Sequence, residues 1–465
     1  MIFTARQLQE KCQEQHLPLY IAFIDLTKAF DSVNRTALWR VLSKIGCPEK
    51  YLEILRLLHD DMMETVVGNG GLETSPFKVD TGVKQGCIIA PTLFAIYISV
   101  ILHLTSQNLP EGVKLMYRTD GGLLNISRFR AKSKVLTSSI MELQYADDNA
   151  LVAHSEADLQ SILDAFARAY WLLGLDLNIK KTQVLHQPAP GTHPQPPTIH
   201  VDGNTLENVD QFAYLGSLLS TRPTIDAEVH HRIGCASAAF ARLRKRLFDN
   251  RDIQARVKLL VYQAVVLPTL LYGADSWTTY SRHLKALEQY QQRCLRKILR
   301  IGWEDRRTNV SVLKEANIPS ITTTIIRHQL RWTGHVMRMA DNRLPKQMLY
   351  GQLKEGKRTQ GGQKKRYKDN IKTHLRQCHL SLTSWEEVAL QRSMWSRMVH
   401  EGTSHLEKDL HRAAEHKRQQ RKERSTTNTA PHTTTTIQSI THTCPHCNKV
   451  CGSRIGLYSH LKTHR

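Results

Sequence analysis

Two adjacent carboxylates within YADD, residues 145–148, are the side chains of this sequence best placed to do chemistry. Short apolar runs flank them in MELQYADDNALVAHS, which predicts a strand, a tight turn and a returning strand. Adjacent aspartates at a hairpin tip repel each other, so folding gains little from placing them there. Mg²⁺ would remove that penalty, because it takes hard oxygen ligands from carboxylates and substrate phosphates. The pair therefore indicates either a Mg²⁺ site or a solvated acidic turn.

A third carboxylate ends another apolar strand far upstream. In LPLYIAFIDLTKAFDSV the apolar run 20–24 is followed by Asp25, and a helix is expected next, with Thr27 or Asp31 as its cap. The end of a buried strand is a favoured place for a metal ligand. Five residues later, Phe30 could form the floor of a sugar pocket and collide with a 2′-hydroxyl. This second acidic strand end favours the metal interpretation of the YADD pair.

Periodic apolar residues and turn residues predict the elements that position these carboxylates. A polar turn from Gly82 to Gly86 would let the backbone approach a base or phosphate, although a structural turn fits it as well. Lys180 and Lys181 could reach a triphosphate. The apolar run 87–104 raises the question of a membrane span, but its proline and flanking polar turn predict a buried core helix. Before residue 222 we further expect helices at 35–45, 49–63 and 156–173 and a strand pair at 212–220. Residues 105–140 are expected to be an insertion that contains a hairpin with the turn TDGG, and residues 187–197 a proline-rich linker.

Charge is distributed unevenly along the 465 residues, whose formal net charge is +22. Residues 1–250 hold 25 Lys and Arg against 26 Asp and Glu, whereas residues 251–465 hold 39 against 16. This asymmetry is typical of a near-neutral catalytic body joined to a basic portion that faces nucleic acid, with a generic basic surface as the alternative. Nine cysteines without a disulfide-like pattern, and no visible signal peptide, indicate a reducing compartment.

The second half of the chain reads as helical and basic. Helical patterns cover 225–248, 253–271 and 283–299, and ARLRKRLF gives the first of them a basic face that is suited to a phosphate backbone or simply solvated. GKRTQGGQKKRYKD, residues 356–369, is a glycine-punctuated basic loop suited to phosphates. Residues 411–440 combine a charged helix or tail with a Thr-rich linker, and KRQQRKER within them could serve nuclear import or bind nucleic acid non-specifically.

A metal-ligand pattern ends the chain. Cys444, Cys447, His460 and His464 have the spacing C-x₂-C-x₁₂-H-x₃-H, which predicts a tetrahedral Zn²⁺ site in a ββα finger. Leu457 occupies the expected core position of such a finger. Cys451 stands where such fingers usually have a core aromatic; it could compete for zinc as a fifth thiol, but we expect it to pack as a small apolar residue. The base-reading helix positions fall on small side chains, Ser453, Gly456 and Ser459, so weak and sequence-poor binding is expected.

The motifs FIDLTKAFDSV, GVKQGCIIAPTLF, YADD, GLDLNIKKTQVL and FAYLGS resemble, in this order, motifs A to E of reverse transcriptases. The sequence of these motifs is similar to that in non-LTR (LINE-type) retrotransposons, and the similarity extends over nearly the whole chain. The resemblance implies an α+β fold: a polymerase palm with an antiparallel sheet and packed helices, a helical thumb, a helical C-terminal region and the small ββα zinc finger. The implied parts are the palm at 1–222, the thumb at 223–300, the basic helical region at 301–410, the linker at 411–440 and the finger at 441–465.

The same resemblance implies roles for individual residues. Asp25, Asp147 and Asp148 would be the catalytic triad that binds two Mg²⁺ ions. Phe30 matches the aromatic residue that selects deoxynucleotides. Three further positions match substrate-binding residues: Gln85 and Gly86 at the templating base and incoming nucleotide, and Lys181, or its neighbour Lys180, at the triphosphate.

An RNA-directed DNA polymerase with an RNA template, a DNA primer and dNTP as partners is therefore expected, without a membrane. Only 24 residues precede Asp25, so we expect the fingers residues that clamp the triphosphate in this family to be missing. The alternative is an inactive, truncated retrotransposon remnant that only binds nucleic acid. The expected location is the nucleus, and also the cytoplasm as a ribonucleoprotein with the element's own RNA.

Overall fold

The structure, a computed structural model, describes residues 1–68, 71–105, 109–131, 133–193, 195–358, 364–427, 442–451 and 454–464. They form two compact units, Met1–Asp409 and Leu410–Arg465. The strands are β1 (Leu19–Ile24), β2 (Met63–Glu64), β3 (Phe77–Lys78), β4 (Val113–Tyr117), β5 (Leu136–Ile140), β6 (Glu142–Tyr145), β7 (Asp148–Ala153), β8 (Gln183–Gln187), β9 (His200–Val201), β10 (Asn204–Thr205), β11 (Glu207–Asn208), β12 (Gln211–Tyr214), β13 (Ser217–Ser220), β14 (Gln352–Leu353), β15 (His442–Thr443) and β16 (Val450–Cys451).

Helices and helical turns make up most of the rest. They are α1 (Ile2–Glu14), α2 (Arg35–Lys44), α3 (Glu49–His59), α4 (Ala90–Thr105), η1 (Ile126–Arg130), α5 (Glu156–Leu172), α6 (Asp226–Leu243), η2 (Arg244–Phe248), α7 (Ala255–Val261), η3 (Tyr262–Val266), α8 (Leu267–Leu270), η4 (Ala274–Ser276), α9 (Ser281–Leu299), α10 (Asn309–Ala316), α11 (Ile321–Met337), α12 (Leu344–Tyr350), α13 (Tyr367–Gln377), α14 (Trp385–Leu390), α15 (Arg392–Thr427), α16 (Arg454–Leu461) and η5 (Lys462–His464).

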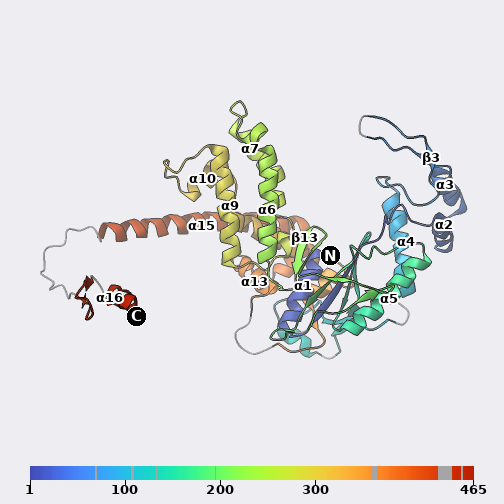
Figure 1. The fold of residues 1–465 in the computed structure, drawn as a ribbon, viewed down its shortest axis with the longest axis horizontal. Coiled ribbons are helices and arrows are strands. Elements are labelled where there is room, and N and C mark those ends of the chain that lie inside the picture. Colours follow the sequence, from blue (N-terminus) through green and yellow to red (C-terminus); the bar gives the residue numbers. More distant parts are fainter. Residues whose placement is uncertain are drawn as a thin grey trace. The chain divides into compact units, whose positions relative to one another are not determined.

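A five-stranded sheet in the order β11-β8-β1-β7-β6 organises the first unit. Its middle strands are almost continuously apolar because both faces of the sheet are covered. Successive side chains point to opposite faces, so Ile21 and Phe23 enter one core while Ala22 and Ile24 enter another. Helices α4 and α5 cover the second of these faces, and α1 with the β12–β13 hairpin covers the first (Figure 1). This arrangement confirms the expected α+β class.

The second half of the unit is helical. Helices α6, α7, α9 and α10 stand together around a separate core that contains the fully buried Trp277 (Figure 1). The region beyond residue 340 returns to the sheet-containing part, because β14 pairs antiparallel with β4 of the insertion. Helix α1 packs against α12 in the same place. The finer division into five parts stays a prediction.

Several local expectations were wrong in instructive ways. Residues 27–32 form turns rather than a helix, and α2 starts later, capped by Asn34, whose side-chain oxygen accepts from the Ala37 N–H at 2.9 Å. TDGG does not form the tip of a two-residue hairpin, because the β4–β5 connection continues through η1. Both of its glycines do have positive φ. Helix α3 ends at His59, before the extended β2.

The charged segment that begins at residue 411 continues α15 as far as Thr427. Residues 428–440 of the expected linker and residue 441 of the expected finger lie outside the described residues. The same holds for residue 194 of the proline-rich linker and for residues 359–363 of the basic loop. Within the described ranges, every helix is too short or too polar to cross a membrane.

Candidate active site

The YADD motif forms the predicted hairpin. Strands β6 and β7 pair antiparallel with Tyr145 opposite Asp148, so Ala146 and Asp147 are the two turn residues. Ala146 has φ +53°, the left-handed conformation that such a tight turn requires. Asp148 is the first residue of β7, and the four residues after Asn149 are fully buried. The buried strand therefore holds the two carboxylates at its exposed end.

Asp25 lies beside this hairpin because β1 pairs antiparallel with β7. Their register places Ile24 opposite Asn149, which brings the next residue of β1 level with Asp148. The backbone of Asp25 is fixed on its other side: its carbonyl accepts from the Asn178 N–H at 2.8 Å, and its N–H donates to the Thr182 hydroxyl at 3.3 Å. The structure thus places all three predicted aspartates at one end of the sheet.

The electrostatics of this end reflect crowded negative charge. Burial and the charges of Asp147 and Asp25 raise the pKa of the Asp148 carboxyl. Lys181 lies nearby, with its Nζ 3.6 Å from Asp25 Oδ2. Both partners of this ion pair are substantially exposed to solvent, so it stabilises the fold little.

These residues fit a hard divalent cation. Asp25 Oδ2 is shielded from solvent and accepts no hydrogen bond, although it is a charged oxygen. The donor set consists of carboxylate oxygens, which suit Mg²⁺. Among the described residues, however, the three carboxylates are not gathered into a ligand group, since the one such group lies in the second unit.

The predicted sugar-pocket residue and the polar turn belong to one loop assembly. The Phe30 ring stacks on Phe94 of α4 with centroids 4.3 Å apart. The Phe30 carbonyl accepts from the Val83 N–H at 2.8 Å, which ties the polar turn to the segment after Asp25. Gln85 and Gly86 lie in the exposed part of this turn, and none of the described contacts joins them to the aspartates.

Gly82 makes the close approach possible. Its φ is +83°, and a Cβ there would lie 2.5 Å from the Asp31 carbonyl oxygen. We expect Gly82→Ala to cost at least about 2 kcal/mol in urea unfolding, because it combines a forbidden contact with left-handed strain. Gly86→Ala is the matched control, since Gly86 has φ +86° but open space around it. It should cost only about 1 kcal/mol. Equal costs for the two variants would show that the contact with Asp31 is unimportant.

Arg35 is a residue that the sequence analysis missed. It is buried, and its guanidinium donates to four backbone carbonyls. These are the carbonyls of His59 (2.6 Å), Val79 (2.8 Å), Thr81 (3.0 Å) and Gly82 (2.8 Å). Arg35 therefore fixes the start of the polar turn against α2. An arginine in the first turn of a helix, where a cation opposes the helix dipole, was the available signal.

A basic surface follows in the helical part. Arg242, Arg244, Lys245 and Arg246 at the end of α6 and in η2 are exposed, whereas Phe248 is buried and stacks on Phe240. The predicted amphipathic pattern is therefore present. One of the four, Arg244, pairs with Asp249 at 3.0 Å, and the others face solvent.

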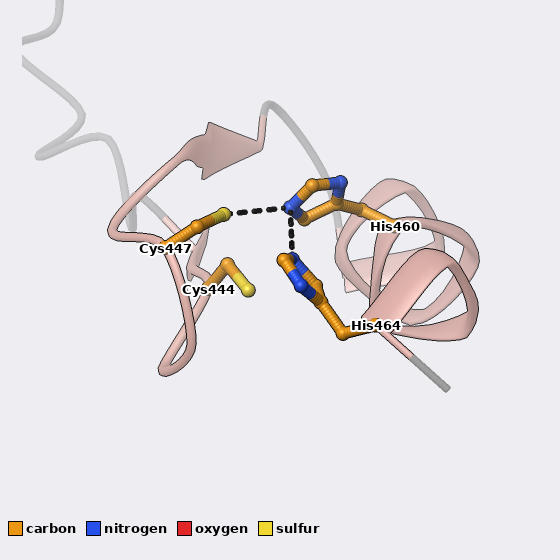
Figure 2. Close-up of side chains that lie close together, drawn as sticks. All are labelled: Cys444, Cys447, His460 and His464. Atoms are coloured by element: carbon orange, nitrogen blue, oxygen red, sulfur yellow. Dashed lines mark hydrogen bonds between the residues drawn. The ribbon is translucent and has the colours of Figure 1, made fainter.

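In the second unit, the four zinc-type ligands come together as predicted. Cys444 and Cys447 follow β15, His460 lies on α16, and His464 lies on η5 (Figure 2). Their ligand atoms all lie within 4.8 Å of one another. Cys447 Sγ is 3.0 Å from His460 Nε2, which in turn is 3.2 Å from His464 Nε2. Two short strands and a helix thus bring two thiols and two imidazoles together, a donor set that would suit Zn²⁺.

The directions in which the pKa values of Cys444 and His460 shift also favour metal binding. Burial alone would raise the pKa of the Cys444 thiol, but the N–H groups of His446 and Cys447 outweigh it and lower that pKa. Burial, with the charges of His464 and Lys449, lowers the pKa of His460. Thiolate and neutral imidazole are the forms that bind Zn²⁺.

The remaining expectations for this finger concern its core and its helix. Leu457 is half-buried, and Cys451 is not a member of the ligand group. Gly456 and Ser459 are exposed on α16, and Ser453 lies outside the described residues.

Known proteins resemble both the motifs and the sequence around them. Residues 2–219 match the family described as reverse transcriptase (RNA-dependent DNA polymerase). A transposon-derived protein of Caenorhabditis elegans is 25% identical over 277 residues, which is 57% of this chain and 97% of that protein. The RNA-directed DNA polymerase from the mobile element jockey of Drosophila melanogaster is 20% identical, over 64% of this chain and 30% of that protein.

The Pol polyprotein of the type-1 retrotransposable element R2 from Popillia japonica is 26% identical, over 61% of this chain and 37% of that protein. The chain thus spans about a third of the length of these two element-encoded relatives. The family match contains β1, the YADD hairpin and the polar turn described above. Residues 2–219 are therefore similar to the reverse transcriptase family.

Proposed function

We propose that this chain is the RNA-directed DNA polymerase of a LINE-type retrotransposon, transferring nucleotides from dNTP to a primer 3′-hydroxyl on an RNA template. The observation that carries the proposal is the convergence of Asp25, Asp147 and Asp148 at one end of a sheet inside the region similar to the reverse transcriptase family. The similarity to the RNA-directed DNA polymerase of jockey and to the Pol polyprotein of R2 supports it.

In this proposal the three aspartates hold two Mg²⁺ ions, which when bound supply charge neutralisation at the attacking and leaving oxygens. Asp25, fixed by Asn178 and Thr182, keeps its carboxylate in place without rearrangement. Lys181 neutralises the triphosphate from the Asp25 side of the site. Phe30, held against Phe94, forms the sugar floor that excludes a 2′-hydroxyl, and Gln85 with Gly86 contacts the templating base and the nucleotide.

The exposed basic face of α6 and η2 serves as the thumb surface that follows the template–primer backbone in this proposal. Its contribution is electrostatic and independent of sequence, so binding should weaken as salt rises. The finger, with structural Zn²⁺, adds a second, sequence-poor contact to nucleic acid. We further propose that the protein acts in the nucleus and forms a cytoplasmic ribonucleoprotein.

Primer extension tests the proposal. The wild-type protein is compared with Asp147→Asn/Asp148→Asn on poly(rA)/oligo(dT) and on heteropolymeric RNA with Mg²⁺. Extension that depends on the aspartates supports a polymerase. If both proteins are equally inactive while both bind template–primer, the chain is instead a nucleic-acid-binding remnant of such an element.

The two neighbouring lysines give a sharper test of the substrate site. Lys181→Met should lower kcat/KM for dTTP by about tenfold or more, because a charge beside the developing negative charge is lost. Lys180→Met removes the same charge from the adjacent position, which has no contact with Asp25, and should change kcat/KM by less than about threefold. Steady-state kinetics on one template measure both. Equal effects would assign no special role to Lys181.

A further inference from the structure

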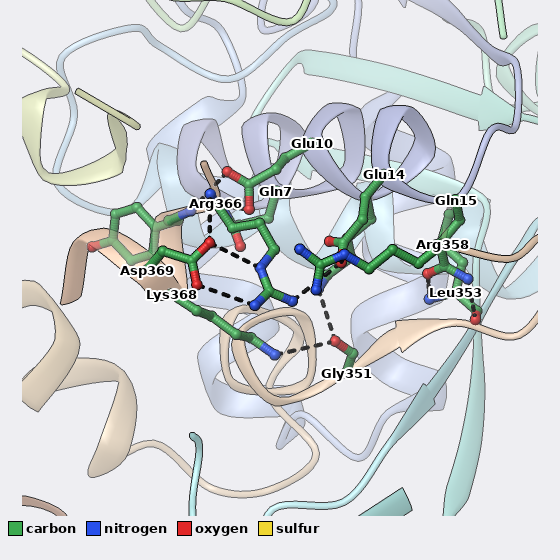
Figure 3. A network of polar contacts seen from close by, with 12 residues as sticks. Gln7, Glu10, Glu14, Gln15, Gly351, Leu353, Arg358, Arg366, Lys368 and Asp369 are labelled. Atoms are coloured by element: carbon green, nitrogen blue, oxygen red, sulfur yellow. Dashed lines mark hydrogen bonds and ion pairs between the residues drawn. The ribbon is translucent and has the colours of Figure 1, made fainter. Parts of the chain in front are cut away.

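A cavity of about 590 Å³ lies between α1, the β4–β5 connection, β14 and the first turn of α13. Side chains of α1, of residues 351–358 and of residues 366–369 converge on it (Figure 3). Helix α1 leads into the start of β1, whereas Asp25 follows the end of that strand, about 20 Å away along its length. The cavity is thus separate from the proposed polymerase site.

Positive charge exceeds negative charge in the lining. Eight Lys and Arg side chains line the cavity, against three carboxylates. Glu14 pairs with Arg358 at 3.0 Å and with Arg366 at 3.1 Å, and Asp369 pairs with Arg366 at 3.1 Å (Figure 3). The third carboxylate, Glu10, accepts from an uncharged hydroxyl and an uncharged backbone N–H. Each of the three carboxylates is therefore already engaged in ion pairs with arginines or in hydrogen bonds. Among the described contacts, none of the three is ion-paired with a lysine of the lining.

Two of these lysines share one neutral acceptor. Lys11 Nζ donates to the Gly351 carbonyl at 2.8 Å, and Lys368 Nζ lies 3.5 Å from the same oxygen. Burial lowers the pKa of both ammonium groups, against the opposing charges of Glu14 and Glu10 at Lys11 and of Glu14 at Lys368. The charges of Lys11, Arg128 and Arg366 lower the pKa of Lys368 further. The side chain of Lys11 is 5% exposed. Lys11 and the half-buried Lys368 thus meet at a neutral acceptor, in a lining whose basic side chains outnumber its carboxylates.

A phosphate ligand matches the cavity in charge and size. The volume lies in the range of small-molecule sites, about 300–1,000 Å³. At the rim, Lys354, Lys357 and Lys372 are exposed and would add further positive charge around the ligand. We propose that this cavity binds a compact polyphosphate anion whose oxygens accept hydrogen bonds from Lys11 and Lys368.

The same phosphate chemistry could come from a free polyphosphate or from a nucleic-acid backbone. A duplex backbone can reach the exposed rim lysines but not the recessed Lys11, so the geometry favours the compact ligand. Both sources are compared directly in the test.

The test measures thermal unfolding and calorimetric binding of the full chain in buffer without divalent cations. The probes are inorganic tripolyphosphate, inorganic phosphate and a twelve-nucleotide single-stranded DNA. Omitting divalent cations suppresses binding of tripolyphosphate at the aspartates, and Lys181→Met is tested in parallel to confirm that those residues play no part.

For the wild type, tripolyphosphate should raise Tm by about 3 °C or more, and more than inorganic phosphate does. Lys368→Met should weaken tripolyphosphate binding about tenfold or more, while Lys368→Arg, which keeps the charge, retains it. The matched control is Lys364→Met, an exposed lysine of the same segment that does not line the cavity. It should bind like the wild type.

The free protein supplies a second readout. Lys368→Met should unfold at the same or a higher temperature than the wild type in the absence of ligand, because it removes a buried repulsion. A purely structural lysine would give the opposite change. Tripolyphosphate binding that is unaffected by Lys368→Met, or Lys368-dependent binding of the DNA alone, would overturn the assignment of a compact polyphosphate site.

Discussion

Asp148→Asn should reduce nucleotide incorporation by at least about 10³-fold, the scale on which charge-stabilising groups act in phosphoryl transfer. In Mg²⁺-free buffer at neutral pH, the same substitution should raise Tm. Both effects follow from the position of the Asp148 carboxylate, which is partly buried beside Asp147 and Asp25. With Mg²⁺ the carboxylate would bind the cation that catalysis needs, whereas without Mg²⁺ its charge destabilises the folded protein.

The pH dependence of stability follows with a definite sign. Because the pKa of Asp148 is raised in the folded state, the folded protein binds this proton more tightly than the unfolded chain does. The stabilisation is complete below the unfolded pKa and is lost as pH rises through the folded one. The Tm gain of Asp148→Asn should therefore appear above that range and vanish at low pH, when measured by thermal unfolding in Mg²⁺-free buffer.

Asp202→Asn is the control for this pair of measurements. Asp202 is exposed in the β9–β10 turn with φ +48°, a conformation that asparagine also tolerates. It should change neither incorporation nor Tm. An Asp148→Asn protein that incorporates nucleotides at the wild-type rate would remove Asp148 from the catalytic set.

The second large effect concerns zinc. Removing Zn²⁺, or replacing its ligand by Cys444→Ser, should unfold the finger, because apparent binding energies of about 10–16 kcal/mol hold such small domains together. Residues 442–464 belong to the second compact unit, so the thermal transition of Met1–Asp409 should not move. Zinc stoichiometry by elemental analysis and imidazole resonances of His460 by NMR report the loss.

Cys451→Ser is the matched control, a thiol of the same finger that is not part of the ligand group. It should retain one zinc per chain. Loss of zinc in Cys451→Ser, with retention in Cys444→Ser, would mean that Cys451 rather than Cys444 is the ligand.

The sequence predicted the placement of the three aspartates, because each of them lies at or directly beside the end of a strand with a clear apolar pattern. The apolar run before Asp25 and the paired aspartates of YADD carry both a strand pattern and a chemical pattern, and the structure places them together. The sequence did not decide which lysine approaches the site, because Lys180 and Lys181 are adjacent residues of the same type. The structure distinguishes them, since it is Lys181 that forms an ion pair with Asp25.

Other features had no local pattern to find. Strand β14 has two residues, too few for an alternation of apolar and polar side chains, and its partner β4 lies more than two hundred residues earlier. The four carbonyls bound by Arg35 come from a loop whose path no periodicity describes. Long-range pairing and buried polar contacts depend on the assembled fold rather than on a sequence window.

The pairing of β14 with β4 has a consequence for the order of folding. Gly351 and Gly356 approach α1 and the chain after it so closely that a Cβ at Gly356 would lie 2.3 Å from the Gln15 carbonyl. During synthesis, one face of α1 and the edge of β4 remain uncovered until residues up to about 370 have left the ribosome. An unpaired edge is a template for aggregation. The risk of aggregation therefore lasts until β14 has paired with β4. We expect the sheet-containing part and the segment around β14 to fold as one cooperative unit.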